Sequence, residues 1–224
     1  GNICTRSCGF CGVQTGRPDT VDWAEPEKVG RSIKIMGIKH AVITSVDRDD
    51  LPDQGTIIWT ETVQAIRRMN PTTTLETLIP DFQGQEHLLD RIVAVAPEVV
   101  SHNMETVRRL TREVRIQAKY DRSLEVLRYL KQEGVFRTKS GLMLGLGETE
   151  EEVIESMEDL RNANVDIITL GQYLQPSKKH LAEAEFITPE QFKKYEVLGK
   201  KMGFRHVESG ALVRSSYKAH KHIE

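Results

Sequence analysis

Apolar residues recur along the chain with two alternating periods, and this alternation predicts the fold. Short runs rich in β-branched residues, such as HAVITSV at 40–46, are typical of buried strands. Longer stretches place apolar residues three or four positions apart, as Val29, Ile33 and Met36 are, which is typical of helices. We expect strands at 40–46, 74–79, 98–101, 137–144, 165–170 and 204–208. We expect helices at 26–36, 56–69, 85–95, 121–133, 150–162 and 189–202.

Several helix boundaries carry residues that satisfy the free backbone groups of a terminal turn. The N-terminal caps that we expect are Thr56, Asp121, Thr149 and Thr188. The last two are followed three positions later by Glu152 and Gln191, which is the spacing of a capping box. Gly134 is expected to end the helix at 121–133. These signals support the helical assignments independently of periodicity.

Strands and helices alternate through the chain, which favours a parallel sheet with right-handed crossover helices. We count about five strand–helix units, so we predict an α/β fold, a partial (open) TIM-like (β/α) barrel. No repeat, linker or low-complexity segment interrupts the pattern. We therefore predict one domain over 1–224, with a C-terminal tail at 209–224 covering the barrel mouth.

Composition narrows the function classes. A length of 224 residues suits one good-sized domain, and a net charge of −2 gives no basic field for nucleic acid. No apolar run is long enough to span a bilayer, so we expect no membrane partner. Only three cysteines are present, which favours a reducing setting, either the cytoplasm or an organelle matrix.

The three cysteines lie within one short loop, Cys4-Thr-Arg-Ser-Cys8-Gly-Phe-Cys11. Three closely spaced thiolates can hold three irons of a [4Fe–4S] cluster and leave the fourth iron open to a small molecule. A structural zinc site would need a distant fourth ligand, and the odd count disfavours a disulfide framework. Three inert buried thiols are a further alternative, although such crowding by chance is improbable.

Polar residues follow the strands, where a parallel barrel has its active site. These tips are 44–50, 102–105, 139–148, 172–175 and 214–217. Three of these segments also have an explanation without function. Asn103 could form an Asx turn, and 47–50 could be a solvated loop with local ion pairs. The glycines of 141–147 could allow tight packing of a strand against a helix. Glu148 to Glu152 are read as helix capping.

Two histidines, two tryptophans and two methionines are considered next for roles in the pocket or in the core. His102 and His180 lie beside polar tips and are possible substrate-pocket residues. Trp23 and Trp59 are expected in the core, and Met143 and Met157 are expected to fill gaps there.

Besides the cysteine loop at 4–11, six further segments carry a recognisable sequence motif. They are TGRP at 15–18, TSVDRDDLPD at 44–53, HNMETV at 102–107, GLMLGLGET at 141–149, GQYLQP at 171–176 and LVRSSY at 212–217. Together with C-x3-C-x2-C and the aromatic Phe10, they resemble the lipoyl synthase family of the radical S-adenosylmethionine (SAM) superfamily. The resemblance covers nearly the whole chain and implies a barrel of the radical SAM type.

The resemblance implies that Cys4, Cys8 and Cys11 bind a [4Fe–4S] cluster whose open iron takes the SAM amine and carboxylate. Asn103 and Glu105 would hold ribose, and Arg115 or Lys119 the SAM carboxylate. The other implied cofactor-binding residues are Phe10, Thr44, Ser45, Val46, Asp47, Gly141, Met143, Gly145, Gln172, Tyr173 and Leu174. Reductive cleavage of SAM would give a 5′-deoxyadenosyl radical that takes hydrogen from an unactivated carbon.

The family inserts two sulfur atoms at C6 and C8 of an octanoyl chain carried on a lipoyl carrier protein. The resemblance therefore implies an octanoylated carrier as substrate and a low-potential ferredoxin- or flavodoxin-type electron donor. It also implies a second, auxiliary [4Fe–4S] cluster, with Ser215 as a ligand and Arg214 beside it in the catalytic site. The auxiliary cysteines are absent from these 224 residues, so we expect an N-terminal segment upstream of Gly1.

Alternatives to this function remain open from sequence. The chain could be another radical SAM enzyme with a different outcome, or a zinc-stabilised binding module without catalysis. Six lysines near the C-terminus could dock an acidic carrier domain, although an ordinary solvated face is the preferred interpretation. These are Lys178, Lys179, Lys193, Lys194, Lys200 and Lys201.

Overall fold

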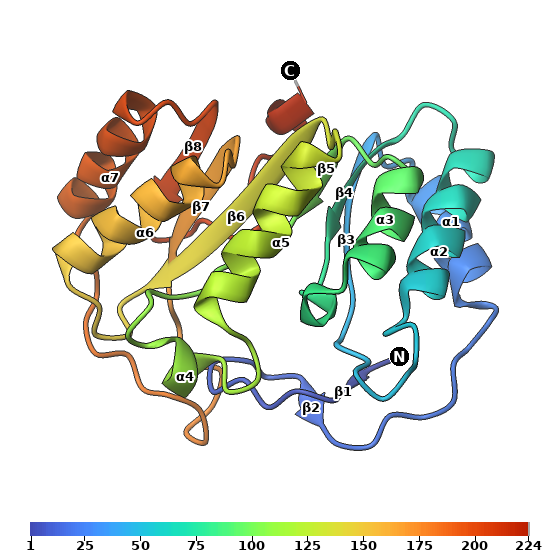
Figure 1. The fold of residues 1–224 in the computed structure, drawn as a ribbon, viewed down its shortest axis with the longest axis horizontal. Helices are drawn as coiled ribbons and strands as arrows, with labels where there is room; N and C mark the ends of the chain where they lie inside the picture. The colour runs from blue at the N-terminus through green and yellow to red at the C-terminus, as the bar shows by residue number, and fades with distance from the viewer. Residues whose placement is uncertain (224) are drawn as a thin grey trace.

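Six parallel strands form one sheet in the computed structural model, which describes residues 1–223. The strands are β3 (His40–Thr44), β4 (Thr74–Leu78), β5 (Val99–Ser101), β6 (Arg137–Leu144), β7 (Ile167–Gln172) and β8 (His206–Gly210). They lie in the sheet in chain order, and neither β3 nor β8 closes onto the other. The predicted open (β/α) barrel is confirmed (Figure 1).

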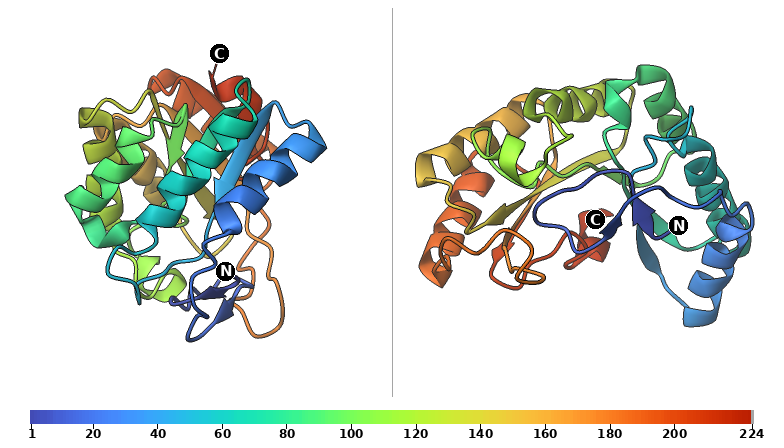
Figure 2. Two further views of the ribbon diagram at one scale, coloured as in Figure 1. Left: turned by 90° about the vertical axis from the view of Figure 1, so that its right-hand side faces the viewer. Right: turned by 90° about the horizontal axis from the view of Figure 1, so that it is seen from below.

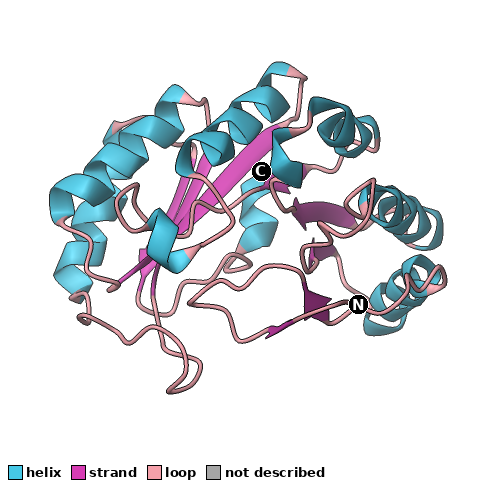
Figure 3. Ribbon diagram, turned by 60° about the horizontal axis from the view of Figure 1, so that its bottom comes forward, coloured by secondary structure: helices cyan, strands magenta, loops and turns pink. Residues whose placement is uncertain are grey.

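Helices cover the convex face of this curved sheet (Figures 2 and 3). They are α1 (Glu25–Met36), α2 (Thr56–Met69), α3 (Glu86–Ala94), α4 (Thr111–Val114), α5 (Tyr120–Gln132), α6 (Glu150–Asn162) and α7 (Pro189–Lys201), with 3₁₀ turns η1 (Phe82–Gly84) and η2 (Ala219–Ile223). Between consecutive strands the chain returns through at least one helix, as parallel pairing requires. Within residues 1–223, none of the helices combines the length and hydrophobicity that a membrane-spanning helix requires.

The hydrophobic core lies between the sheet and these helices. Leu75 of β4 packs with Ile33 of α1 and Ile66 of α2, and all three are fully or nearly fully buried. Ile168 of β7 belongs to another apolar cluster together with Met157 of α6. Because side chains alternate across a strand, the residues between these apolar ones face the concave side of the sheet. That side is polar, as the buried Glu76, Ser101 and Lys139 illustrate.

The cysteine loop crosses the carboxyl ends of the strands, as the lower part of Figure 1 and the right panel of Figure 2 show. Its two short strands, β1 (Ile3–Cys4) and β2 (Gln14–Thr15), pair in parallel. The backbone N–H and hydroxyl of Thr5 both donate to the carbonyl of Asp47, at 3.1 and 3.0 Å. Asp47 lies three residues after Thr44, the last residue of β3, so these bonds attach the loop to the segment that follows that strand.

The C-terminal segment after β8 turns inward. It was expected to begin at 209, but β8 extends to Gly210, and the following residues enter the concave side of the sheet. That the tail covers the barrel mouth stays a prediction. The right panel of Figure 2 shows the C-terminus inside the curve of the strands. Val213, Ala219 and His222 are buried there. Glu224, the last residue of the predicted tail, lies outside the described residues.

The helix caps agree with the sequence in part. The capping box of Thr149 and Glu152 is present in full. Thr188 accepts from the Gln191 amide, but the Gln191 side chain donates to Glu150 instead of completing a box. The other two expected caps were wrong. Gly55 precedes α2 while Asp53 accepts from the Ile57 amide, and Lys119 precedes α5.

Core assignments were also mixed. Trp59 is buried as expected, whereas Trp23 is 66% exposed, so that prediction was wrong. Met157 fills the core, and Met143 lines a cavity instead. The short helix α4 was not predicted because four residues are too few to show a helical period.

The Thr149 cap gives a direct test of local stability. Replacing Thr149 with Ala should lower the free energy of unfolding by about 1 kcal/mol, because the Glu152 amide loses its acceptor. Ser32→Ala, on the exposed side of α1, is the matched control and should change it by less than about 0.5 kcal/mol. Urea titration of both variants checks this, and equal effects would contradict the assignment.

Candidate active site

The Cys4 sulfur is the most enclosed of the three thiols. It accepts the backbone amides of Arg6 and Asp47 at 3.4 and 3.3 Å. Burial raises the pKa of the Cys4 thiol, and burial raises the pKa of Cys8 to about 12. All three cysteines are free. Thiols in this state are poor nucleophiles by themselves, but amide donors around a sulfur are the environment in which a metal-bound thiolate is stabilised.

Arg6 fixes the cysteine loop through buried charges. Its guanidinium donates to both carboxylate oxygens of Asp49 and to Asp81, each at 2.7 Å. Asp47 lies 3.2 Å from Nε on the same guanidinium. Arg122 of α5 binds the other oxygen of Asp81 at 2.8 Å. One side chain of the loop is therefore joined to residues that follow β3 and β4 and, through Asp81, to α5.

The electrostatics of this cluster follow from burial. Asp81 is fully buried, and although burial alone would raise its pKa, Arg6 holds the pKa of Asp81 well below its usual range. The expectation that 47–50 is a solvated loop with weak local ion pairs is correct only for Arg48 and Asp50, which pair with each other. For Asp47 and Asp49 it was wrong, because their partner lies on the cysteine loop.

A cavity of about 270 Å³ lies beside the cysteine loop at the carboxyl ends of the strands, and we call it the mouth cavity. It brings together ten of the predicted site residues. They are Phe10, Asn103, Glu105, Gly141, Met143, Gln172, Tyr173, Leu174, Arg214 and Ser215. These residues come from the cysteine loop, from the ends of β5, β6 and β7, and from the C-terminal segment.

The wall of the mouth cavity includes a buried polar atom without a hydrogen-bond partner among residues 1–223. Asn103 donates to Glu105 and to the Ser215 hydroxyl, each at 3.0 Å, but its buried Oδ1 accepts no hydrogen bond from residues 1–223. A Cβ at Gly141 would lie 2.7 Å from the Thr169 hydroxyl and 3.1 Å from Asn103 Oδ1. Glycine at 141 therefore keeps this wall flat next to the Asn103 oxygen.

Glu105, a half-buried residue of this wall, lies within electrostatic reach of the buried Arg115. Burial raises the pKa of Glu105, and the nearby Arg115 opposes that rise. Arg115 also donates to the carbonyl of Met104 at 2.8 Å, and its charge opposes the raised pKa of Cys8. Lys119 is exposed and immediately precedes α5, so the two basic residues differ sharply in their access to the loop.

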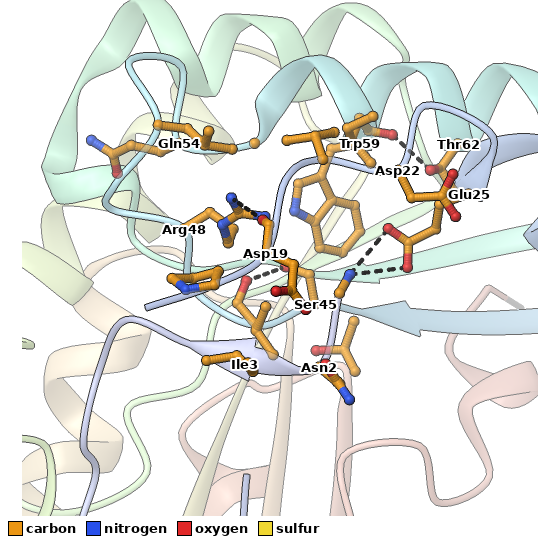
Figure 4. A pocket seen from close by; sticks show the side chains of 18 of the residues that line it. Asn2, Ile3, Asp19, Asp22, Glu25, Ser45, Arg48, Gln54, Trp59 and Thr62 are labelled. Atoms are coloured by element: carbon orange, nitrogen blue, oxygen red, sulfur yellow. Dashed lines mark hydrogen bonds and ion pairs between the residues drawn. The ribbon is translucent and has the colours of Figure 1, made fainter. Parts of the chain in front are cut away.

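Seven of the predicted cofactor-binding residues do not line the mouth cavity: Asp47, Arg115 and Lys119, and also Thr44, Ser45, Val46 and Gly145. Thr44, Ser45 and Val46 line a second cavity of about 390 Å³, between the N-terminal residues, β3 and α2. Figure 4 shows Ser45 there with Arg48 and Trp59. Gly145 has a φ of 100°, and a Cβ on it would lie 2.3 Å from the Gln172 side chain. Its glycine is thus required by the turn after β6.

The sequence agrees with one superfamily and, within it, with one family. A model of the Radical SAM superfamily matches residues 1–160. Lipoyl synthase of Flavobacterium psychrophilum is 83% identical over 100% of this chain and 77% of that protein. Mitochondrial lipoyl synthase of Nematostella vectensis is 79% identical over the same shares. The chain belongs to the lipoyl synthase family.

Solved structures agree at the level of the fold. Methylornithine synthase has a TM-score of 0.70 at 15% identity, with 96% of this chain and 70% of that chain covered. SuiB of Streptococcus suis bound to SAM has a TM-score of 0.73 at 13% identity, with 97% and 50% covered. These likenesses show a shared fold, which agrees with the predicted open barrel, while the matching family model shows the superfamily.

Membership of this family implies a [4Fe–4S] cluster and SAM, and the residues present fit both. Three free thiols of one loop provide soft ligands, and two backbone amides already point at the Cys4 sulfur. The unpartnered Asn103 oxygen and the flat glycine wall suit a polar ligand with a planar ring. The alternative of a zinc-stabilised binding module is replaced by the family assignment.

Sequence reasoning missed Arg6, Asp81 and Arg122. Arg6 lies between two cysteines, which was a usable signal, but its carboxylate partners lie 43 and 75 positions away. Of the two histidines considered, His102 is buried behind the wall and contacts the Ile79 carbonyl and the Ser123 hydroxyl. His180 contacts the carbonyl of Cys11 at 3.0 Å, so it supports the cysteine loop.

His102 predicts a pH dependence of stability. Burial, with a further effect of Arg115, lowers the pKa of His102 to about 4 from its ordinary 6.5. Between these values the unfolded chain binds a proton that the folded chain does not. The contribution of His102 to the free energy of unfolding is therefore fully present above pH 6.5 and is lost as the pH falls toward the pKa of the folded chain. At about pH 5 the loss is about 2 kcal/mol.

Urea titrations at about pH 7.5 and about pH 5 measure this difference. His102→Asn should remove most of it, whatever that variant does to stability at the higher pH. A variant that retains the full pH difference would show that other groups cause it.

Proposed function

We propose that this chain is the radical SAM core of a lipoyl synthase that inserts sulfur at C6 and C8 of a protein-bound octanoyl chain. The observation that carries the proposal is the cysteine loop fixed beside a cavity whose wall includes the unpartnered Asn103 oxygen, in a chain 83% identical to a lipoyl synthase. We further propose that residues 1–224 act as one domain. The six strands β3 to β8 lie in one sheet, which supports this.

Cys4, Cys8 and Cys11 would hold the cluster. When bound, the cluster and SAM supply a carbon radical strong enough to remove hydrogen from an unactivated C–H bond. The chain's own contribution is to hold the three thiolates in one loop and to limit the access of water. Arg6 does the first by fixing the loop to the strand ends.

The residues that would hold SAM are assigned by their chemistry. The Asp47 carboxylate lies next to the cysteine loop, where its Oδ1 pairs with Arg6, and its negative charge suits an ammonium group, with Ser45 nearby in sequence. Asn103 and Glu105 offer acceptors for ribose hydroxyls, and buried Arg115 is favoured over exposed Lys119 for the carboxylate. The backbone of Phe10, Gly141 to Gly145 and Gln172 to Leu174 would surround adenine, with Thr44 and Val46 placed farther away.

Ser215 and Arg214 would serve the sulfur-donating half of the reaction. We propose Ser215 as a ligand of an auxiliary [4Fe–4S] cluster, since its hydroxyl reaches the mouth cavity beside Asn103. All three cysteines of the 224 residues belong to the loop at 4–11, so any thiolate ligands of that cluster would come from outside this sequence.

The partners follow from this chemistry. We propose an octanoylated lipoyl carrier as substrate, a low-potential ferredoxin or flavodoxin as electron donor, and a reducing compartment such as cytoplasm or organelle matrix. Four of the six C-terminal lysines considered for carrier docking lie on α7, and three of them already pair with Glu196 or Glu150. These pairs support the ordinary solvated face.

The test is an anaerobic assay of the full-length reconstituted protein with SAM, reductant and an octanoylated carrier domain. We expect SAM cleavage together with two sulfur insertions per carrier. Cys8→Ser should abolish both, because one iron loses its ligand. Ser215→Ala should abolish sulfur insertion and keep at least part of SAM cleavage.

Each alternative outcome has a distinct meaning. SAM cleavage without sulfur insertion by the parent protein would remove the lipoyl synthase function and leave another radical SAM reaction. Full sulfur insertion by Ser215→Ala would remove only the proposed role of Ser215.

A further inference from the structure

The concave side of the sheet contains a fully buried ion pair that the proposed chemistry does not use. Lys139 of β6 donates to both oxygens of Glu76 of β4, at 2.7 and 3.0 Å, and neither side chain is exposed. Ser101 of β5 donates to the same carboxylate at 2.6 Å. Three adjacent strands thus contribute one residue each to a charged cluster inside the barrel.

The C-terminal segment, residues 211–223, lies directly against this cluster, and we call it the tail. The Lys139 ammonium group also donates to the backbone carbonyl of Ser215. Farther along the tail, the buried ring of His222 brings Nδ1 to 3.9 Å from Glu76. Contacts with Lys139 and His222, together with Ser101, keep Glu76 ionised, so its pKa lies below the usual value despite burial.

Two more contacts hold the tail at the level of the mouth cavity. A Cβ at Gly171 of β7 would lie 2.3 Å from the carbonyl oxygen of Val213, so only glycine permits this approach. The Asn103 amide donates to the Ser215 hydroxyl at 3.0 Å. The Ser215 hydroxyl therefore faces the cavity while its carbonyl faces the buried lysine.

We propose that the Glu76–Lys139 pair is a positioning element that anchors the tail inside the barrel and sets the place of the Ser215 hydroxyl. This inference rests on the proposed function, because it gives the pair a role in presenting Ser215. Neither Glu76 nor Lys139 lines the mouth cavity, so both act through the tail.

Physical reasons favour an anchor over a simple stabilising pair. Removing two charges from water is expensive, and a buried ion pair is often replaceable by apolar residues without loss of stability. The Lys139 ammonium group binds both Glu76 and the Ser215 carbonyl. Because Glu76 fixes the position of the ammonium group, the ammonium group in turn fixes the position of that carbonyl. The tail has few apolar anchors of its own, with Leu212 82% exposed.

The experiment uses the full-length protein with the double substitution Glu76→Gln and Lys139→Met. Removing both charges together avoids an unpaired buried charge, so the fold should persist. Hydrogen exchange of peptides covering 211–223 should accelerate by about tenfold or more, because the bonded amides of Tyr217, Ala219 and Lys221 lose their support. Lys194→Met, which breaks an exposed pair between α7 and α6, is the control and should leave this exchange unchanged.

His222→Leu is a second variant that keeps the side-chain volume. It should accelerate exchange mainly at the end of the tail, since the contacts of the His222 ring with Glu76 and His206 are lost there. Parental exchange rates throughout the tail in both the double variant and His222→Leu would overturn the anchor.

The positioning role is measured by coupling, the amount of sulfur inserted per SAM consumed. The double variant should lose coupling by about tenfold, together with a changed EPR spectrum of the auxiliary cluster. Accelerated exchange with parental coupling and spectrum would overturn the positioning role.

The variant Ser215→Ala separates the two proposals. If it retains a parental auxiliary-cluster spectrum, Ser215 is no ligand, while the exchange result still decides whether the Glu76–Lys139 pair anchors the tail.

Discussion

The contact of Arg6 with three carboxylates is the interaction on which the site depends. The cysteine loop has little apolar surface of its own, so packing alone does not hold it above the strands. A planar guanidinium can bind several carboxylates in fixed directions, and here it binds Asp49 and Asp81 while approaching Asp47. Since Asp81 is fully buried, the loss of Arg6 would leave a carboxylate with only Arg122 as its cation.

The barrel separates its apolar and polar contents by the alternation of strand side chains. Residues such as Leu75 and Ile168 pack under the helices, which stabilises the scaffold. The residues between them face inward, where Glu76 and Lys139 pair and the tail fills the interior. The placement of the tail therefore depends on the polar residues that face inward. The apolar residues under the helices determine whether the barrel forms.

Much of this arrangement could be predicted from the sequence because it depends on local pattern. Strand β6 was predicted with the observed bounds, and the Thr149 capping box was recognised from two residues. The path of the tail and the partners of Arg6 could not be predicted, because periodicity contains no information on which distant charges meet. Asp121 illustrates a local failure: it resembles a cap, but it lies inside α5 and binds Arg108.

The central claim is that Arg6 holds the cysteine loop in place. Its most direct test is SAM binding to the reconstituted cluster of Arg6→Met and Arg48→Met, monitored by the change in the EPR spectrum of the reduced protein. Arg48 is the control because it pairs with exposed Asp50 in the same region. We predict that Arg6→Met weakens SAM binding by at least about tenfold and lowers the free energy of unfolding by about 3 kcal/mol, while Arg48→Met changes neither appreciably. Parental SAM affinity and stability in Arg6→Met would contradict the account.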